Sequence, residues 1–182
     1  MAGPARQSPP ATSFEALVGP IVPALRRFAW TLVRNETEAD DLVQDCLERA
    51  FTRWAARRPD ADVKAWLFTI LYNLRISRWR TWLRRGGDHL RVEDREDLIS
   101  PDAGAEQKLM VQDVLTGLQR LPEDQRAVLV LVGVEELSYA AAARIVGVPI
   151  GTVMSRLSRG RENLRRYVDG EAHAQPRLRR VK

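Results

Sequence analysis

The sequence has little of the chemistry on which metal sites and disulfide-linked folds depend. Its 182 residues include one cysteine and two histidines, so an internal disulfide is excluded and soft ligands are too few for a structural zinc site. No uninterrupted apolar run approaches the ~20 residues that cross a bilayer. The Pro- and Ala-rich stretch 1–11 lacks the apolar core of a secretory signal and is expected to be disordered. We therefore expect a reduced, cytoplasmic protein with no metal, no cofactor and no membrane insertion.

The composition is that of a protein with a packed core and a moderate excess of positive charge. Hydrophobic residues make up 45% of the chain, and 29 Lys and Arg against 24 Asp and Glu give a net charge of +5. Apolar residues recur at spacings of three and four, and hardly any stretch alternates with a period of two, which favours helices throughout. The sequence predicts an all-α protein.

A change of composition near the middle of the chain predicts two helical domains. Between residues 86 and 106 the apolar periodicity is lost. This stretch contains seven acidic and two basic residues, together with glycines and a proline. Such a stretch is typical of an extended, solvated linker. We expect a first domain over residues 12–86, an acidic linker over 87–106, a second domain over 107–170 and a frayed basic tail over 171–182.

The first domain is predicted to contain three helical stretches. The first begins at a capping box of Thr12 and Glu15 and is divided by Pro20 and Pro23. Asn35 is expected to cap the second, which ends near residue 56, and the third extends over residues 62–85.

An acidic stripe lies on one face of the second predicted helix. It consists of Asp41, Gln44, Asp45 and Glu48, at spacings of three and four. Paired carboxylates can act as general acid and base, but neither a histidine nor a partner nucleophile accompanies them. The stripe is therefore either a solvated face or a docking face for a basic partner.

The third predicted helix combines arginines with aromatic residues. Five arginines and no acidic residue lie between Tyr72 and Arg85, interleaved with Trp79 and Trp82. Unpaired bases stack on aromatic rings while arginines hold phosphates, so the pattern suits single-stranded nucleic acid. Alternatively the tryptophans belong to the core, as we expect for Trp66, and the arginines form a solvated face.

The second domain ends in a helix-turn-helix pattern. Ser138 is a good N-cap for a short helix, Gly147 ends it, and a longer helix follows Pro149. Small hydroxyls and arginines near the start of a helix suit reading of the DNA major groove. They are Thr152, Ser155, Arg156 and Arg159. The alternative is an ordinary amphipathic helix with a basic solvated face.

An enzymatic role finds little support in the sequence. The single thiol, Cys46, falls on an apolar stripe, which predicts a buried and inert side chain. His89 lies in the predicted linker and His173 in the predicted tail, so neither is a credible base. No catalytic residue is expected.

Four ordered motifs resemble those of the extracytoplasmic-function (ECF) sigma factors, the two-domain specificity subunits of bacterial RNA polymerase. The motifs are Ala39–Asp45 (ADDLVQD), Ala65–Asn73 (AWLFTILYN), Leu121–Arg126 (LPEDQR) and Gly147–Arg159 (GVPIGTVMSRLSR). Four motifs in order are more specific than a lone helix-turn-helix. The rival reading, a stand-alone helix-turn-helix repressor or activator, accounts for the second domain only.

The resemblance assigns roles to the residues in these motifs. It implies an initiation factor that binds core polymerase, recognises the minus-35 and minus-10 promoter elements, melts DNA and is regulated by an anti-sigma factor. The implied polymerase contacts are Asp41, Gln44, Asp45 and Glu48. The implied minus-10 contacts are Asn73, which would hold a flipped base, and Arg75, Arg78, Trp79 and Arg80. The implied minus-35 contacts are Thr152, Ser155, Arg156, Ser158 and Arg159.

Overall fold

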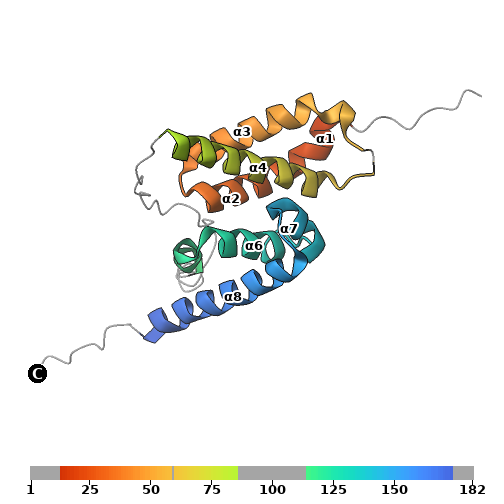
Figure 1. Cartoon of the computed structure of the whole chain (residues 1–182). Coiled ribbons are helices and arrows are strands. Elements are labelled where there is room, and N and C mark those ends of the chain that lie inside the picture. Colours follow the sequence, from red (N-terminus) through yellow and green to blue (C-terminus); the bar gives the residue numbers. More distant parts are fainter. Residues whose placement is uncertain (1–12, 59, 86–113, 174–182) are drawn as a thin grey trace, which may run out of the picture.

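The computed structural model describes residues 13–58, 60–85 and 114–173, with side chains to residue 170, and these residues form two helical units (Figure 1). The first unit contains α1 (Phe14–Val18), η1 (Gly19–Ile21), α2 (Val22–Val33), α3 (Glu36–Thr52), η2 (Trp54–Ala56) and α4 (Val63–Arg84). The second contains helical residues 114–120, α6 (Glu123–Gly133), α7 (Tyr139–Val146) and α8 (Ile150–His173). No strand occurs among the described residues, and the all-α prediction is confirmed. The predicted linker and the predicted N-terminal segment lie outside them.

Two prolines divide the first predicted helix, as the sequence indicates. Pro20 lies in the 3-10 turn η1, and Pro23 in the first turn of α2, where a missing N–H costs nothing. The N-cap of α1 is Ser13, whose Oγ accepts from Ala16 N at 3.2 Å; Thr12 lies outside the described residues. Residues 14–33 are, by length and composition, apolar enough to span a membrane, although polar residues interrupt the stretch. The 3-10 turn η1 interrupts this stretch, and the apolar side of α1 and α2 packs into the protein core.

The core of the first unit lies between α2, α3 and α4. Phe28 and Phe68 are fully buried, with ring centroids 5.1 Å apart. The side chains of Asn35 and Asp62 cap α3 and α4 by accepting backbone N–H groups at 2.9 and 3.2 Å. The helix α3 ends at Thr52, earlier than the sequence predicts, because the chain tightens into the 3-10 turn η2.

The second unit contains the predicted helix-turn-helix, formed by α7 and α8. Ser138 Oγ accepts from Ala141 N at 3.1 Å and begins α7. Gly147 ends α7 with φ +70°, a left-handed conformation in which a side chain is strained. Val153 and Leu157 anchor α8 in the core.

Two glycines let helices approach α8 closely. A Cβ on Gly117 would lie 2.7 Å from Leu164 Cδ1, so residues 114–120 lie against α8 with no space for a methyl group. A Cβ on Gly160 would lie 3.0 Å from Leu129 Cδ1 and 3.5 Å from Gln125 O of α6. The position of α8 within its unit is thus set at two separate crossings.

The two units pack directly against each other. The helix α2 lies on α6, and α4 lies on α7, so buried residues of both units form one continuous apolar cluster. The helix α3 lies on the side of the first unit that faces away from the second (Figure 1). This closed arrangement determines which of the predicted contact surfaces are open to solvent.

Candidate nucleic-acid and polymerase interfaces

The first turns of α8 carry the predicted minus-35 contacts. Val153 and Leu157 point into the core, so the residues between them lie toward the opposite side of the helix. Ser155, Ser158 and Arg159 are exposed, whereas Thr152 and Arg156 are half-buried. The structure therefore places the five residues on one helix with their predicted face partly open.

Arg156 does not extend freely into solvent. Its Nε lies 3.0 Å from Asp124 Oδ2, in the first turn of α6, and its side chain is 25% exposed. A guanidinium in this ion pair has fewer donors available for a guanine or a phosphate. The predicted base contact of Arg156 would therefore require that DNA replace Asp124 as its partner.

The predicted minus-10 contacts lie along the second half of α4. Asn73, Arg78, Trp79 and Arg80 are exposed, and Trp79 is 45% exposed although it is a large apolar side chain. Trp66 packs instead against the core beside Trp54. An exposed tryptophan among arginines provides the stacking surface that single-stranded nucleic acid requires.

Arg75 is the exception among these residues. Its Nη2 donates to Glu123 Oε2 of the second unit at 3.1 Å, and its side chain is only 18% exposed. Its Nε is buried and meets no acceptor among the described residues. In the closed arrangement Arg75 contacts protein rather than solvent.

The acidic stripe on α3 is open to solvent. Asp41, Gln44 and Glu48 are exposed and Asp45 is half-buried, and Gln44 Nε2 donates to Glu48 Oε1 at 3.1 Å. The predicted polymerase face and the predicted DNA face meet at one ion pair, because Arg78 Nη2 donates to Asp45 Oδ2 at 2.6 Å. Arg78 Nη2 also donates to Asp41 O at 3.3 Å.

Tyr72 lies where α4, the start of α6 and α8 come together. Burial is the main cause that raises the pKa of its phenol. The charges of Glu123, Arg156, Asp124 and Arg75 act on the same pKa, in that order of size. These five residues form the central charge cluster, in which cations predicted to bind DNA from both units meet two adjacent carboxylates.

Glu135, just after α6, carries a buried carboxylate that joins the units. Its side chain is 1% exposed; Oε1 accepts from Arg27 Nη2 at 2.9 Å, and Oε2 lies 3.2 Å from Lys64 Nζ. Lys64 Nζ also donates to Glu135 O at 2.8 Å. Both cations belong to the first unit, so among the described residues the ion pairs of Glu135 cross the interface.

Arg126 is a second buried charge at the interface. Its Nε donates to Thr31 O, in the last turn of α2, at 2.6 Å, and its Nη1 donates to Leu121 O and Gln119 O at 2.9 and 3.2 Å. Burial, followed by the charge of Arg34, lowers its pKa to about 10, so it stays protonated near neutral pH. The sequence placed Arg126 in a motif but predicted no role for it, and it predicted none for Glu135. The reason is that the spacing of charged residues along a helix does not show which of them are buried.

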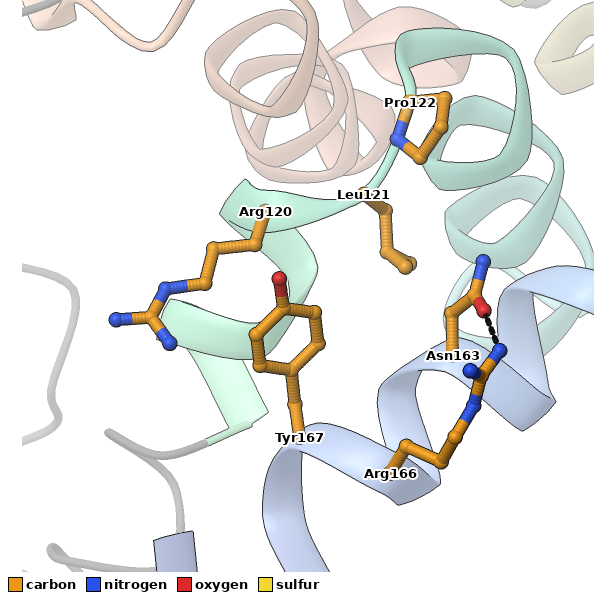
Figure 2. Close-up of a pocket in the computed structure, with 6 residues that line it drawn as sticks. All are labelled: Arg120, Leu121, Pro122, Asn163, Arg166 and Tyr167. Atoms are coloured by element: carbon orange, nitrogen blue, oxygen red, sulfur yellow. Dashed lines mark hydrogen bonds between the residues drawn. The ribbon is translucent and has the colours of Figure 1, made fainter. Parts of the chain in front are cut away.

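A surface pocket of about 350 Å³ lies between the start of the second unit and the far half of α8 (Figure 2). It is lined by Arg120, Leu121, Pro122, Asn163, Arg166 and Tyr167. The Arg120 guanidinium lies over the Tyr167 ring, 5.1 Å from its centroid, and Arg166 donates to Asn163 Oδ1. Its polar lining is thus engaged in contacts within the protein.

Cys46 is fully buried, as the sequence predicts. Its Sγ donates to Leu67 O at 3.5 Å, and burial raises the pKa of the thiol to about 12. The thiolate, which is the nucleophilic form, is therefore suppressed near neutral pH. Within the described ranges, no three His, Cys, Asp or Glu side chains are grouped so that they could hold a metal ion.

Two family models match the chain in the order of its units. The sigma2 domain of PhyR matches residues 18–72, and sigma-70 region 4 matches residues 112–164. The first match covers α2, α3 and half of α4, and the second covers the helix-turn-helix.

Curated relatives and a solved structure extend the likeness over both units. The ECF RNA polymerase sigma factor EcfG of Rhodopseudomonas palustris is 40% identical over 155 residues, which cover 82% of each chain. The ECF RNA polymerase sigma factor SigM of Mycobacterium tuberculosis is 37% identical over 146 residues, 79% of this chain and 71% of SigM. The sigma factor RpoE of Bartonella quintana, solved in complex with the anti-sigma factor NepR, superposes with a TM-score of 0.77 at 34% identity, over 87% of this chain and 98% of RpoE. With both units matched in order and the identity spread over most of its length, this chain belongs to the ECF sigma factors of the sigma-70 family.

Proposed function

We propose that this chain is a cytoplasmic transcription initiation factor that binds core RNA polymerase, recognises the minus-35 and minus-10 promoter elements and promotes DNA melting. The observation that carries the proposal is the distribution of charge: basic faces on α4 and α8 belong to different units, and the exposed acidic stripe on α3 meets the face of α4 at the Arg78–Asp45 ion pair. A factor that joins DNA to a large enzyme needs these opposite surfaces at once. Its role is in binding, and we assign it no catalytic residue and no cofactor.

In this proposal, residues 12–86 form the domain that contacts polymerase and melts DNA. Exposed carboxylates on a rigid helix suit a basic surface of the polymerase's largest subunit. The contacts are Asp41, Gln44, Asp45 and Glu48.

The exposed second half of α4 would hold the melted minus-10 strand. Trp79 offers a stacking surface, and the amide of Asn73 offers both a donor and an acceptor to a flipped base. The cations for the backbone are Arg75, Arg78 and Arg80. Of these, Arg75 becomes available only when its contact with Glu123 opens.

Residues 107–170 would form the minus-35 domain, joined to the first by the acidic segment 87–106. Its readers are side chains in the first turns of α8, three of them exposed and two half-buried, and an arginine there can bind guanine O6 and N7 together. They are Thr152, Ser155, Arg156, Ser158 and Arg159.

An anti-sigma factor is the further partner in this proposal. The support is the similarity to RpoE, which was solved with NepR. Such a partner would keep the chain from polymerase until a signal releases it.

Run-off transcription with purified core polymerase, followed by mapping of start sites, tests the proposed function. We expect defined start sites that depend on the chain, and Arg156→Ala should weaken minus-35 recognition by about 1–3 kcal/mol. A gel shift separates the rival reading: a stand-alone repressor binds duplex tightly alone, whereas this factor should bind weakly until polymerase is added. Tight duplex binding without polymerase, together with no run-off product, contradicts the proposal.

A further inference from the structure

We propose that Ile150 and Met154, two exposed apolar side chains at the start of α8, contact thymine methyl groups and thereby help to select the minus-35 element. This inference rests on the proposed function and deepens it, since it adds an apolar specificity determinant to the polar contacts assigned above. Ile150 is 47% and Met154 is 51% exposed. They are four residues apart on one helix, so the two side chains are neighbours on its surface. We call this pair the apolar edge.

The apolar edge borders the face that α8 presents to solvent. Val153 and Leu157 are buried and define the core side of the helix, and each residue along a helix is rotated by about 100° from the one before. The apolar edge therefore lies on one flank of the core side. Thr152 and Arg156, both half-buried, lie on the other flank. Between the two flanks is a face that points away from the core.

This outward face carries very little side chain. Its central positions are Gly151 and Ser155, both exposed. A Cβ on Gly151 would meet no described atom within 4 Å, so packing does not require a glycine at this position. Glycine weakens a helix but lets another molecule approach the backbone closely. The apolar edge therefore stands beside a shallow floor that base edges can reach.

The chemistry of the apolar edge suits one base in particular. Of the groups that the four bases present in the major groove, the thymine methyl is the apolar one. The side chains of Ile150 and Met154 carry no hydrogen-bond donor, so they cannot pair with the carbonyl and ring-nitrogen acceptors of the other bases. Contact with a methyl group removes apolar surface of both molecules from water, and the flexible methionine can adapt to its position.

The apolar edge needs no change of partner before it can make this contact. Ser155 Oγ donates to Thr152 O at 3.0 Å, and Arg156 Nε lies 3.0 Å from Asp124 Oδ2. For these polar groups, a hydrogen bond to DNA would replace one within the protein, which reduces the net gain. The apolar edge exchanges water alone. It can therefore contribute to selection out of proportion to its size.

The test replaces thymine by deoxyuridine, which removes the methyl group and keeps every hydrogen-bonding group of the base. Each thymine of the upstream element, on either strand, is replaced in turn in a promoter mapped by run-off transcription. Competition binding then compares these promoters on polymerase that carries the full chain. The variants are Met154→Ala and Ile150→Ala, and the control is Val134→Ala, an apolar side chain that is 51% exposed and lies outside α8.

We expect the wild type to lose about three- to fivefold in affinity at one or two thymines, the effect of one methyl contact. At the same position Met154→Ala or Ile150→Ala should bind thymine and deoxyuridine equally. Val134→Ala should keep the full discrimination. All three side chains are exposed, so melting curves followed by circular dichroism should stay close to that of the wild type, which separates selection from folding.

Gly151→Ala tests the floor beside the apolar edge. The added methyl group meets open space among the described residues, so the thermal stability should be unchanged or higher. Promoter affinity should nevertheless fall at least about threefold, because the methyl group occupies space that a base edge needs. Unchanged promoter affinity in this variant contradicts the close approach on which the inference depends.

Three results overturn the inference while the proposed function stands. The first is an upstream element in which no thymine methyl affects affinity, and the second is full methyl discrimination in both edge variants. The third is weaker polymerase binding by Met154→Ala with unchanged discrimination, which would assign the edge to a protein partner. If the wild type gives no promoter-specific transcription, the proposed function fails. Selection by the full chain from random duplexes, made with thymine or with deoxyuridine, then still reports whether Met154 selects the methyl group.

Discussion

Arg126 offers the sharpest test of how the two units depend on each other. Arg126 is 4% exposed, and Arg126→Met keeps most of the length of its side chain but removes the guanidinium, which donates to three backbone carbonyls. Hydrogen bonds from a charged donor are worth about 1.5–3 kcal/mol each, so three are worth about 4.5–9 kcal/mol. The variant no longer buries a charge, which returns several kcal/mol, about 3–5. We therefore expect the free energy of unfolding to fall by about 1.5–4 kcal/mol.

Urea denaturation followed by circular dichroism measures this change, with Arg161→Met, an exposed arginine of α8, as the control. Thr31 lies in the first unit and Leu121 in the second, so the variant should also separate their unfolding and broaden the transition. A loss below about 0.5 kcal/mol in a single unchanged transition would refute the reasoning, because Arg126 would then contribute no measurable stability to the contact between the two units.

Three further predictions concern the first unit. Asn73 is exposed, so Asn73→Ala should reduce open-complex formation, measured by permanganate reactivity, while polymerase affinity stays unchanged; equal loss of both would contradict a role in holding a base. Asp45→Arg should weaken polymerase binding in a pull-down titration, yet lower stability by no more than about 1 kcal/mol, because the pair with Arg78 that it breaks is solvated. For Cys46, burial raises the thiol pKa from 9.0 to about 12, so its contribution to stability is complete below pH 9 and decreases, by about 1.4 kcal/mol per pH unit, as pH rises toward 12. Cys46→Ala should remove that dependence in urea titrations at pH 8 and pH 10, and an identical slope in both proteins would count against it.

Local signals in the sequence predicted the helices and several of their ends, although α3 ends earlier than predicted and Ser13 caps α1. Asn35 and Ser138 cap helices where a short polar side chain precedes an apolar repeat, and Gly147 ends one in the left-handed region. These features depend on a few neighbouring residues, which is why they can be read from the chain. Ile150 lies three residues before the buried Val153, a spacing that favours burial, yet it is 47% exposed. A side chain in the first turn of a helix can lie beyond the edge of the core and stay in contact with solvent.

The arrangement of the units could not be read in the same way. The residues that join them, such as Arg27, Lys64 and Glu135, are far apart in sequence and are ordinary surface residues by type. The predicted site residues lie on the predicted helices, but whether Arg75 contacts solvent or protein depends on packing between units. The role of each site residue stays a prediction that the experiments above address.

The two tight crossings at Gly117 and Gly160 have a consequence for how promoters are read. Each crossing leaves no space for even a methyl group without displacing Leu164 or Leu129. The angle of α8 within its unit is therefore sensitive to the size of the residue at both positions, and Gly160 directly follows the predicted minus-35 contact Arg159. A larger residue at Gly117 or Gly160 is expected to tilt α8. Such a substitution would change promoter preference without altering a residue that contacts DNA.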